Sequence, residues 1–386
     1  GENGKIETNK DGKKRSIAAD ELGFKPAKNG CDLYLTIDER IQYIVEKELE
    51  KTFLDFKAKG AVAVVMNVQT GEVLALANRP GYDPNNLKMA TVSGMKNQAV
   101  NMAYEPGSIF KIIALAAGLS EKVTTENEII DCENGSFEVY NHKINDHIKY
   151  KMLSFRQVIE LSSNIGTAKM GARLGPEKLY KCAKSFGFGE KTNIQLAGEI
   201  RGTLRPVEKW SGLSPYIMPI GQEVSATGIQ LISAMNAVAN KGKYMQPLIV
   251  KYIKDNEGRT IKEFAPVELR QAVDEATARR MTAVLRGVVE NGTGKEAGVE
   301  GISVAGKTGT AQKFDPVTRK YSTYKYVSSF IGFVPAEKPK IAILVSIDEP
   351  NGVYWGGSVA APCFSKIAKQ ALRYMEKESY DLVKNN

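Results

Sequence analysis

The stretch that decides the fold covers residues 104–119 and reads YEPGSIFKIIALAAGL. Its Pro-Gly pair predicts a sharp turn directly before Ser108, and the apolar residues that follow predict a helix. Ser108 and Lys111 are three positions apart, so both side chains lie on one face of that helix. The helix would bury Lys111 near the positive end of its dipole, and both effects lower the pKa of an amine. The stretch therefore predicts a serine hydroxyl beside a neutral lysine base.

The S-x-x-K spacing alone is weak, because it occurs three times, at Ser93–Lys96, Ser108–Lys111 and Ser322–Lys325. Only Ser108 follows a Pro-Gly turn and precedes an apolar helix. A capping serine followed by a lysine whose stem lies along the helix also explains the spacing. A lysine base is favoured over histidine, since His142 and His147 lie in a polar stretch without an obvious Ser–Asp pair and G-x-S-x-G is absent.

Two further motifs follow in chain order. Ser162-Ser163-Asn164 is the only S-x-N of the chain and separates two predicted helices. Its hydroxyl can relay a proton and its amide can hold a substrate amide, although a polar turn between helices explains it equally. Lys307-Thr308-Gly309-Thr310 contains the only K-T-G and follows strand-like residues 302–305. A strand edge with Gly lets an extended peptide pair alongside, and the amine and hydroxyls can bind a carboxylate; a turn at a strand end is the alternative.

The ends of the chain are rich in strand signals, whereas the middle, from about 108 to 290, is rich in helix signals. Near the start, the turn sequence Gln69-Thr70-Gly71-Glu72 between two apolar runs indicates a hairpin. A sheet that joins both ends of the chain around helices corresponds to an α+β domain. The expected strands are 61–66, 73–77, 302–305, 326–334 and 340–347, and the expected helices include 155–161, 165–173, 228–239, 275–289, 362–376 and one that opens at 36–39.

The chain has 386 residues, enough for one large domain or two ordinary ones. Its 53 Lys and Arg against 44 Asp and Glu give a net charge of +9, which suits an anionic partner or a solvated surface. No nucleic-acid-binding motif is present, so nucleic acid is not expected as a partner. Four scattered cysteines predict no disulfide framework. No apolar run reaches the roughly 20 residues that span a bilayer. Because the first residue is Gly1, we expect a fragment whose start was removed.

A metal site is the remaining alternative for chemistry. Cys132, His142, Asp146 and His147 lie within 16 residues and are acceptable zinc ligands. Their spacing matches no zinc pattern, and a polar surface loop is the plainer interpretation. Since a Ser–Lys pair supplies nucleophile and base by itself, no metal and no cofactor are expected.

The three motifs occur in the order S-x-x-K, S-x-N, K-T-G, with 54 positions from Ser108 to Ser162 and 145 from Ser162 to Lys307. This order is typical of penicillin-binding proteins and serine β-lactamases. The region from about 30 to 377 resembles class B penicillin-binding proteins, most closely their cell-division branch. The stretches that carry the resemblance are YEPGS at 104–108, PIGQEV at 219–224, VAGKTGTA at 304–311, FIGFVP at 330–335, DEP at 348–350 and GSVAAP at 357–362.

The resemblance implies a role for each motif residue. Ser108 would attack the penultimate D-Ala carbonyl of a stem peptide, and Lys111 would take its proton. Ser162 would pass a proton to the leaving amine, and Asn164 would hold the substrate amide and orient Lys111. Lys307, Thr308, Gly309 and Thr310 would bind the terminal carboxylate or its β-lactam equivalent. The backbone N–H groups of Ser108 and Thr310 would form the oxyanion hole.

For the whole protein, the resemblance implies a penicillin-binding, serine β-lactamase-like fold with a central antiparallel sheet, flanking helices and a helical subdomain. Residues 1–30 would be a linker or the end of an amino-terminal pedestal domain, and residues 31–386 the transpeptidase domain. The implied activity is a peptidoglycan D,D-transpeptidase that forms a Ser108 acyl-enzyme with D-Ala-D-Ala stem peptides, cross-links them in septal wall synthesis and is inhibited covalently by β-lactams.

The resemblance also implies a membrane-anchored protein on the outer face of the cytoplasmic membrane. Its partners would be the septal glycan-polymerising membrane glycosyltransferase and other divisome proteins. A serine β-lactamase and a β-lactam-sensing receptor domain remain alternatives. The former needs a base that activates water, and no loop like the class A one with its deacylating Glu is found. The latter resembles class D enzymes, which carry Val where Asn164 stands.

Overall fold

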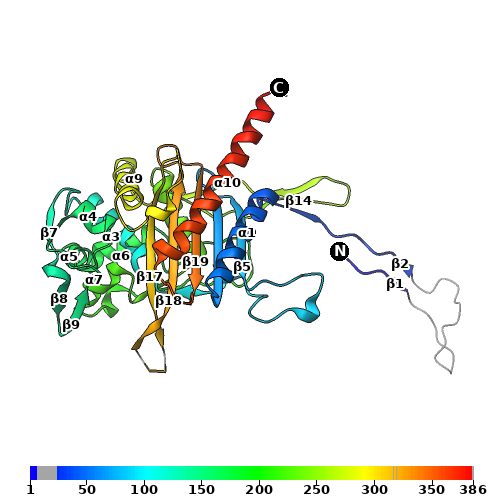
Figure 1. Ribbon diagram of the computed structural model, residues 1–386. Coiled ribbons are helices and arrows are strands. Elements are labelled where there is room, and N and C mark those ends of the chain that lie inside the picture. Colours follow the sequence, from blue (N-terminus) through cyan, green and yellow to red (C-terminus); the bar gives the residue numbers. More distant parts are fainter. Residues whose placement is uncertain (7–23, 316, 319, 385–386) are drawn as a thin grey trace. The chain divides into compact units, whose positions relative to one another are not determined.

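The computed structural model describes residues 1–6, 24–315, 317–318 and 320–384, with side chains up to residue 377. The chain divides into two compact units (Figure 1). One comprises Gly1–Thr36 with Val250–Ala265, and the other comprises Ile37–Ile249 with Pro266–Asn386. The smaller unit therefore takes a segment from the middle of the chain, which the sequence did not lead us to expect.

The smaller unit is built from short antiparallel strands. β14 (Val250–Lys254) pairs with β3 (Asp32–Leu35) on one side and with β15 (Thr260–Glu263) on the other, while β1 (Lys5–Ile6) pairs with β2 (Phe24–Lys25). Tyr34 and Tyr252 stack across the β3–β14 pair with ring centroids 4.4 Å apart. The assignment of residues 1–30 to a linker or pedestal domain stays a prediction.

A five-stranded antiparallel sheet forms the centre of the larger unit. Its order is β17-β18-β19-β4-β5, so strands from both ends of the chain share one sheet, as the sequence predicted. β19 is buried along its whole length, because it lies in the middle of a sheet that is covered on both faces. The strands are β4 (Gly60–Asn67), β5 (Val73–Arg79), β17 (Ala305–Asp315), β18 (Lys320–Val334) and β19 (Ile341–Asp348).

Helices cover both faces of this sheet. On one face, α1 (Glu39–Asp55) and α10 (Gly356–Lys384) pack side by side against the strands (Figure 1). Alternate residues of β4 and β19 point into that layer, where the apolar side of α1 meets them. On the other face lies α8 (Gly228–Ala239), every residue of which is buried. The predicted α+β class with a central antiparallel sheet is confirmed.

Beyond α8, a mainly helical region lies on the far side of the sheet from α1 and α10 (Figure 1). Its helices are α3 (Lys111–Ser120), α4 (Phe155–Glu160), α5 (Asn164–Leu174), α6 (Pro176–Ser185) and α9 (Glu275–Glu290), with the short α2 (Gln98–Asn101) and α7 (Ser214–Ile217). Short strands connect them: β6 (Ala103–Tyr104), β7 (Ile129–Asp131), β8 (Ser136–Val139), β9 (His142–Asn145), β10 (Met152–Ser154), β11 (Thr203–Leu204), β12 (Val224–Thr227), β13 (Lys243–Met245) and β16 (Glu268–Gln271).

Several predicted boundaries are wrong; the strand expected at residues 326–334, for example, begins at Lys320. The strand expected at residues 302–305 begins only at Ala305, and it continues through the K-T-G motif because pairing with β18 runs from Ala305 onward. The last helix begins at Gly356 rather than Pro362. Pro362 therefore lies inside α10, where it removes one backbone donor.

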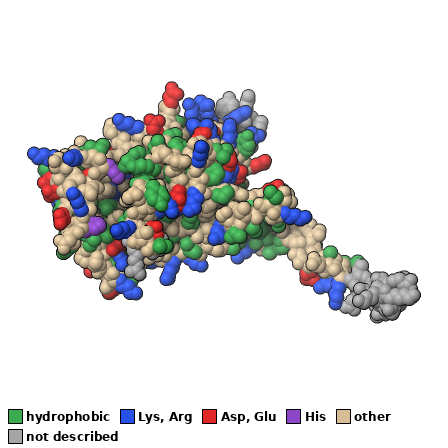
Figure 2. Space-filling view, turned by 60° about the horizontal axis from the view of Figure 1, so that its bottom comes forward, with side chains coloured by type: hydrophobic (Ala, Val, Ile, Leu, Met, Phe, Trp, Pro, Cys, Tyr) green, Lys and Arg blue, Asp and Glu red, His purple; other side chains and the backbone are tan. Residues whose placement is uncertain are grey.

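The excess of basic residues does not form one patch on the face shown in Figure 2, where Lys and Arg are interspersed with Asp and Glu. Many of them form ion pairs; Arg280, for example, donates to both carboxylate oxygens of Glu126 at 2.7 Å.

None of the helices in the described ranges combines the length and the apolar character needed to cross a bilayer.

Candidate active site

The predicted nucleophile lies in a tight turn that only glycine permits. Ser108 belongs to the 3-10 turn Gly107–Phe110, which leads directly into α3. Gly107 has a φ of +54° and Gly221 a φ of +88°. The two backbones cross so closely that a Cβ at Gly221 would lie 2.0 Å from the Gly107 carbonyl oxygen. The PIGQEV stretch therefore supports the turn that presents Ser108.

Lys111 begins α3 one turn after Ser108 and is fully buried. Its Nζ donates to the Ser162 carbonyl oxygen at 2.7 Å and to Asn164 Oδ1 at 2.8 Å, and it lies 3.2 Å from Ser162 Oγ. Burial lowers the pKa of Lys111 to about 7, although the negative charge of Asp146 opposes the change. Lys111 is therefore buried at the start of this helix, as the sequence predicted, and its role as the base stays a prediction.

Ser162 and Asn164 lie at the junction of α4 and α5, as the sequence predicted. Ser162 has a φ of +59°, an uncommon value for a residue other than glycine. Ser163 caps α5, since its Oγ accepts from Gly166 N at 3.0 Å. Asn164 is held from two sides, because it accepts from Lys111 and its Nδ2 donates to Asn145 O at 2.9 Å.

Lys307 approaches Ser162 from the sheet. It lies on β17, the edge strand of the sheet, and is fully buried. Its Nζ donates to Ser162 Oγ at 3.0 Å and to the Thr308 carbonyl oxygen at 3.2 Å. Burial, together with the charge of Lys111, holds the pKa of Lys307 well below its usual value. One hydroxyl, that of Ser162, thus contacts two buried amines that come from opposite sides of the site.

The rest of the K-T-G motif forms the sheet-side wall. Thr308 Oγ1 lies 2.6 Å from Thr293 Oγ1, and Thr310 Oγ1 accepts from Gly356 N at 3.0 Å. Gly356 lets the start of α10 approach the motif closely, because a Cβ at Gly356 would lie 2.2 Å from the Gly309 carbonyl oxygen. The K-T-G motif is therefore part of a β-strand that contacts Thr293 and the start of α10, and it is not a turn.

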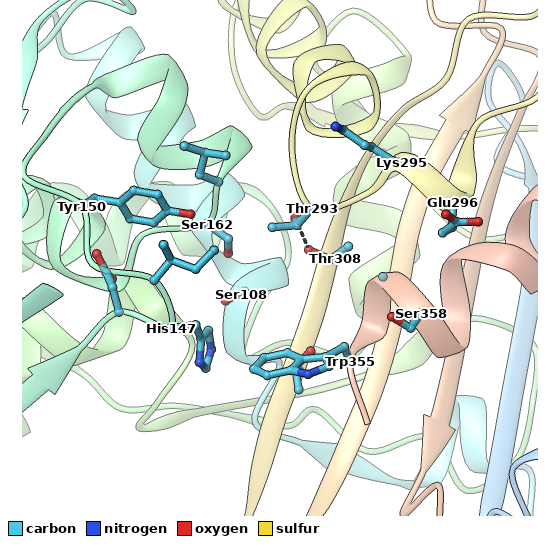
Figure 3. A pocket seen from close by; sticks show the side chains of 15 residues that line it. Ser108, His147, Tyr150, Ser162, Thr293, Lys295, Glu296, Thr308, Trp355 and Ser358 are labelled. Carbon is cyan, nitrogen blue, oxygen red and sulfur yellow. Dashed lines mark hydrogen bonds between the residues drawn. The ribbon is translucent and has the colours of Figure 1, made fainter. Parts of the chain in front are cut away.

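Two hollows meet at Ser108. One, of about 420 Å³, is lined by Ser162, Thr308 and Thr310 among others, and the second, of about 410 Å³, by Asn164 and Thr310 among others. Ser108, His147, Thr310 and Trp355 line both hollows. His147 and Trp355 come from opposite walls and meet edge to face, with ring centroids 4.6 Å apart (Figure 3).

Several lining residues were missed at the sequence level. Tyr150, Thr293 and Trp355 belong to none of the three short motifs, yet they line the first hollow (Figure 3). The signal for Trp355 was present, because it lies between the DEP and GSVAAP stretches. The other two S-x-x-K pairs, Ser93–Lys96 and Ser322–Lys325, line neither hollow.

The possible zinc ligands have other contacts. Asp146 accepts hydrogen bonds from the amino end of α5, and Cys132 is buried beside the Ser163 hydroxyl. His142 lies on β9 and is exposed, while His147 contacts Trp355. Within the ranges that the structure covers, no three His, Cys, Asp or Glu side chains are grouped as metal ligands.

Comparison with known proteins defines the family. The model of the penicillin-binding protein transpeptidase domain matches residues 61–369, which include every predicted site residue. The chain belongs to the penicillin-binding protein transpeptidase family. The penicillin-binding relatives are of the class B type that the motifs resemble, so this prediction is confirmed.

Stage V sporulation protein D of Bacillus subtilis is 38% identical over 96% of this chain and 58% of its own length. A probable peptidoglycan D,D-transpeptidase, PenA, of Neisseria meningitidis is 34% identical over 91% of this chain and 58% of its own length. The chain thus spans little more than half of these two penicillin-binding relatives. Penicillin-binding protein 3 of Mycobacterium tuberculosis, solved with ampicillin, superimposes with a TM-score of 0.85 at 32% identity, over 92% of this chain and 81% of the solved one.

Proposed function

We propose that this chain is the catalytic part of a peptidoglycan D,D-transpeptidase that is acylated at Ser108. The substrate is a stem peptide that ends in D-Ala-D-Ala, and β-lactams react with the same serine. The observation that carries the proposal is the Ser162 hydroxyl, which lies 3.2 Å from Lys111 Nζ and 3.0 Å from Lys307 Nζ in the wall of the first hollow, which Ser108 also lines.

In the acylation step, Ser108 Oγ attacks the carbonyl carbon of the penultimate D-Ala. A neutral amine has two N–H groups and one lone pair. Lys111 directs donors to the Ser162 carbonyl and Asn164 Oδ1, which leaves its lone pair for a hydroxyl proton. Lys111 takes the Ser108 proton, and the backbone N–H groups of Ser108 and Thr310 stabilise the oxyanion.

The peptide bond then breaks, and the leaving amine needs a proton. Ser162 passes one from Lys111 to the amine of the terminal D-Ala, whose carboxylate is held by Lys307, Thr308 and Thr310. A second stem peptide then supplies an amine that attacks the Ser108 ester. That amine gives up a proton, which returns through Ser162 and Lys111 to Ser108 Oγ as the new amide forms.

Intact-mass analysis after mixing with a penicillin tests the acylation. We expect one equivalent of adduct, which peptide mapping places on Ser108. The adduct should be stable, with almost no turnover of a chromogenic cephalosporin over minutes, because a base that aims water at the ester is worth about 100- to 10,000-fold and none is assigned here. Rapid multiple turnover with recovery of free Ser108 would instead make the protein a β-lactamase.

We also propose that the whole protein acts at the septum, on the outer face of the cytoplasmic membrane, with a membrane glycosyltransferase that polymerises septal glycan and other divisome proteins. Support comes from the division-branch resemblance of the DEP and GSVAAP stretches. The name of the Bacillus subtilis relative indicates a sporulation stage, so the two roles must be separated. Depletion should give filaments during growth. Normal division with defective spores would assign the protein to sporulation instead, and rounded cells to elongation.

A further inference from the structure

Asp146 connects the loop after β9 to the amino end of α5. Its Oδ1 accepts from the backbone N–H groups of Asn164 and Ile165, the latter at 3.1 Å. Its Oδ2 accepts from the Ser163 hydroxyl at 2.6 Å. The first N–H groups of a helix have no partner within the helix, so a carboxylate from a distant loop satisfies them here and favours the dipole.

The residue that Asp146 holds is the one that contacts the lysine. The backbone N–H of Asn164 donates to Asp146 Oδ1, and the side-chain Oδ1 of Asn164 accepts from Lys111 Nζ at 2.8 Å. The side chain of Asn164 is held as well, because its Nδ2 donates to the carbonyl oxygen of Asn145, the residue directly before Asp146. The loop at 145–146 therefore sets both the backbone and the side chain of the residue that orients Lys111.

We propose that Asp146 is a positioning residue for acylation, which fixes the amino end of α5 and, through Asn164, the amine of Lys111. This inference rests on the proposed function. Asp146 also provides negative charge near a buried amine, and it lines the first hollow beside Ser162.

In the part of the chain that the structure describes, few charged or titratable groups lie near Asp146 and Lys111. Lys307 and His147 face Lys111, and the charge of Lys111 lowers the pKa of each of them, after the larger effect of burial. Tyr150 and Cys132 face Asp146, whose charge adds to burial in raising their pKa values. Among these groups Asp146 is the one whose charge favours protonated Lys111.

Two substitutions distinguish the hydrogen bonds that Asp146 accepts from the α5 backbone from the effect of its negative charge on Lys111. Asp146→Asn keeps an oxygen that can accept from the α5 backbone but removes the charge. The acylation rate rises with pH as Lys111 becomes neutral, and Asp146 raises the pKa of Lys111, so Asp146→Asn should move the acid limb of the rate to lower pH. Asp146→Ala removes the acceptor as well, and should slow penicillin acylation about 10- to 100-fold, since small misplacements of a catalytic group have effects of that size.

Asp38 offers a matched control. Its Oδ1 accepts from Arg40 N and Ile41 N, both at 2.9 Å, and its Oδ2 accepts from the Tyr374 hydroxyl at 3.2 Å. Asp38, the N-cap residue of α1, thus also accepts from two backbone N–H groups and one hydroxyl at the start of a helix. Asp38→Asn and Asp38→Ala should therefore lower the melting temperature as the Asp146 variants do, without changing the acylation rate of the folded protein or its pH profile.

The test measures stopped-flow acylation by a fluorescent penicillin between pH 5.5 and 9. Thermal melts of the wild type and the four variants show whether each protein is folded. A folded Asp146→Ala protein that acylates at the wild-type rate, or an equal loss of rate in Asp38→Ala, would overturn the positioning role. An acid limb in Asp146→Asn that superimposes on wild type would exclude an effect of the Asp146 charge on Lys111. If Asp146→Ala does not fold, Asp146→Glu takes its place, because it keeps a carboxylate but displaces the capping oxygen by one methylene, and a wild-type acylation rate in that variant would overturn the positioning role in the same way. A wild-type protein that takes no label would overturn the proposed function, and this inference with it.

Discussion

β17 and the segments around α3 and α5 face each other across the site, and they are positioned in different ways. β17 owes its position to continuous pairing with β18, so Lys307, Thr308 and Thr310 lie along a straight edge. On the helical side, Ser108, Lys111, Ser162 and Asn164 all lie at helix starts or junctions, where side-chain hydrogen bonds hold Lys111 and Asn164 and Ser163 caps α5. The difference suggests that the sheet side binds the substrate and the helical side moves the protons.

The largest effect is expected when the proposed nucleophile on the helical side of the site is removed. Ser108→Ala should abolish covalent labelling by penicillin, as measured by intact mass, because Ser108 lies one turn before Lys111, where the two hollows meet. Ser93→Ala and Ser322→Ala, at the other two S-x-x-K pairs, are the controls and should label like wild type. An adduct that persists in Ser108→Ala would place the nucleophile elsewhere.

Lys111→Arg should give the next largest effect. The guanidinium stays protonated at any working pH, so it cannot accept the Ser108 proton. We expect acylation about 100- to 10,000-fold slower, the usual worth of a general base. Circular dichroism and a thermal melt check that the variant is folded. Near wild-type acylation in a folded Lys111→Arg protein would show that another group is the base.

A change on the sheet side should affect binding more than the limiting rate. Thr308→Val removes one hydroxyl from the carboxylate site, and a hydrogen bond to a charged group is worth about 1.5–3 kcal/mol, or about 10- to 100-fold in affinity. Saturation kinetics of acylation separate the two quantities. Thr293→Val, which removes only the partner of Thr308, is the control. If Thr308→Val lowers the limiting rate and leaves apparent affinity unchanged, the proposed division between the two sides is wrong.

The pH dependence of acylation by the wild-type protein should be the smallest of these effects. Lys111 has a pKa of about 7 and acts as a base in its neutral form, so acylation should fall as pH decreases through 7. Between pH 8 and pH 6 we expect about a tenfold decrease, which follows from the fraction of neutral amine. An acylation rate that stays constant between pH 8 and pH 6 would mean that the pKa of the proton acceptor lies below this range.

Much of the site could be predicted because its parts are local in sequence. The turn before Ser108, the burial of Lys111 and the junction at Ser162 follow from neighbouring residues. The continuation of the strand through Lys307 could not be predicted as well, because pairing with β18 determines it. The contact between His147 and Trp355 and the cap that Asp146 provides join segments distant in sequence, so no local pattern reports them. The catalytic roles themselves stay predictions.

The two hollows that share Ser108 also bear on inhibitor design. They have similar volumes and different linings, so small fragments can be sought for each one separately. Once two fragments are joined, the second binds as an intramolecular event, and the gain depends on whether the linker spans the gap. Here the linker would pass the His147–Trp355 contact, so a flat and narrow linker fits this protein better than a branched one.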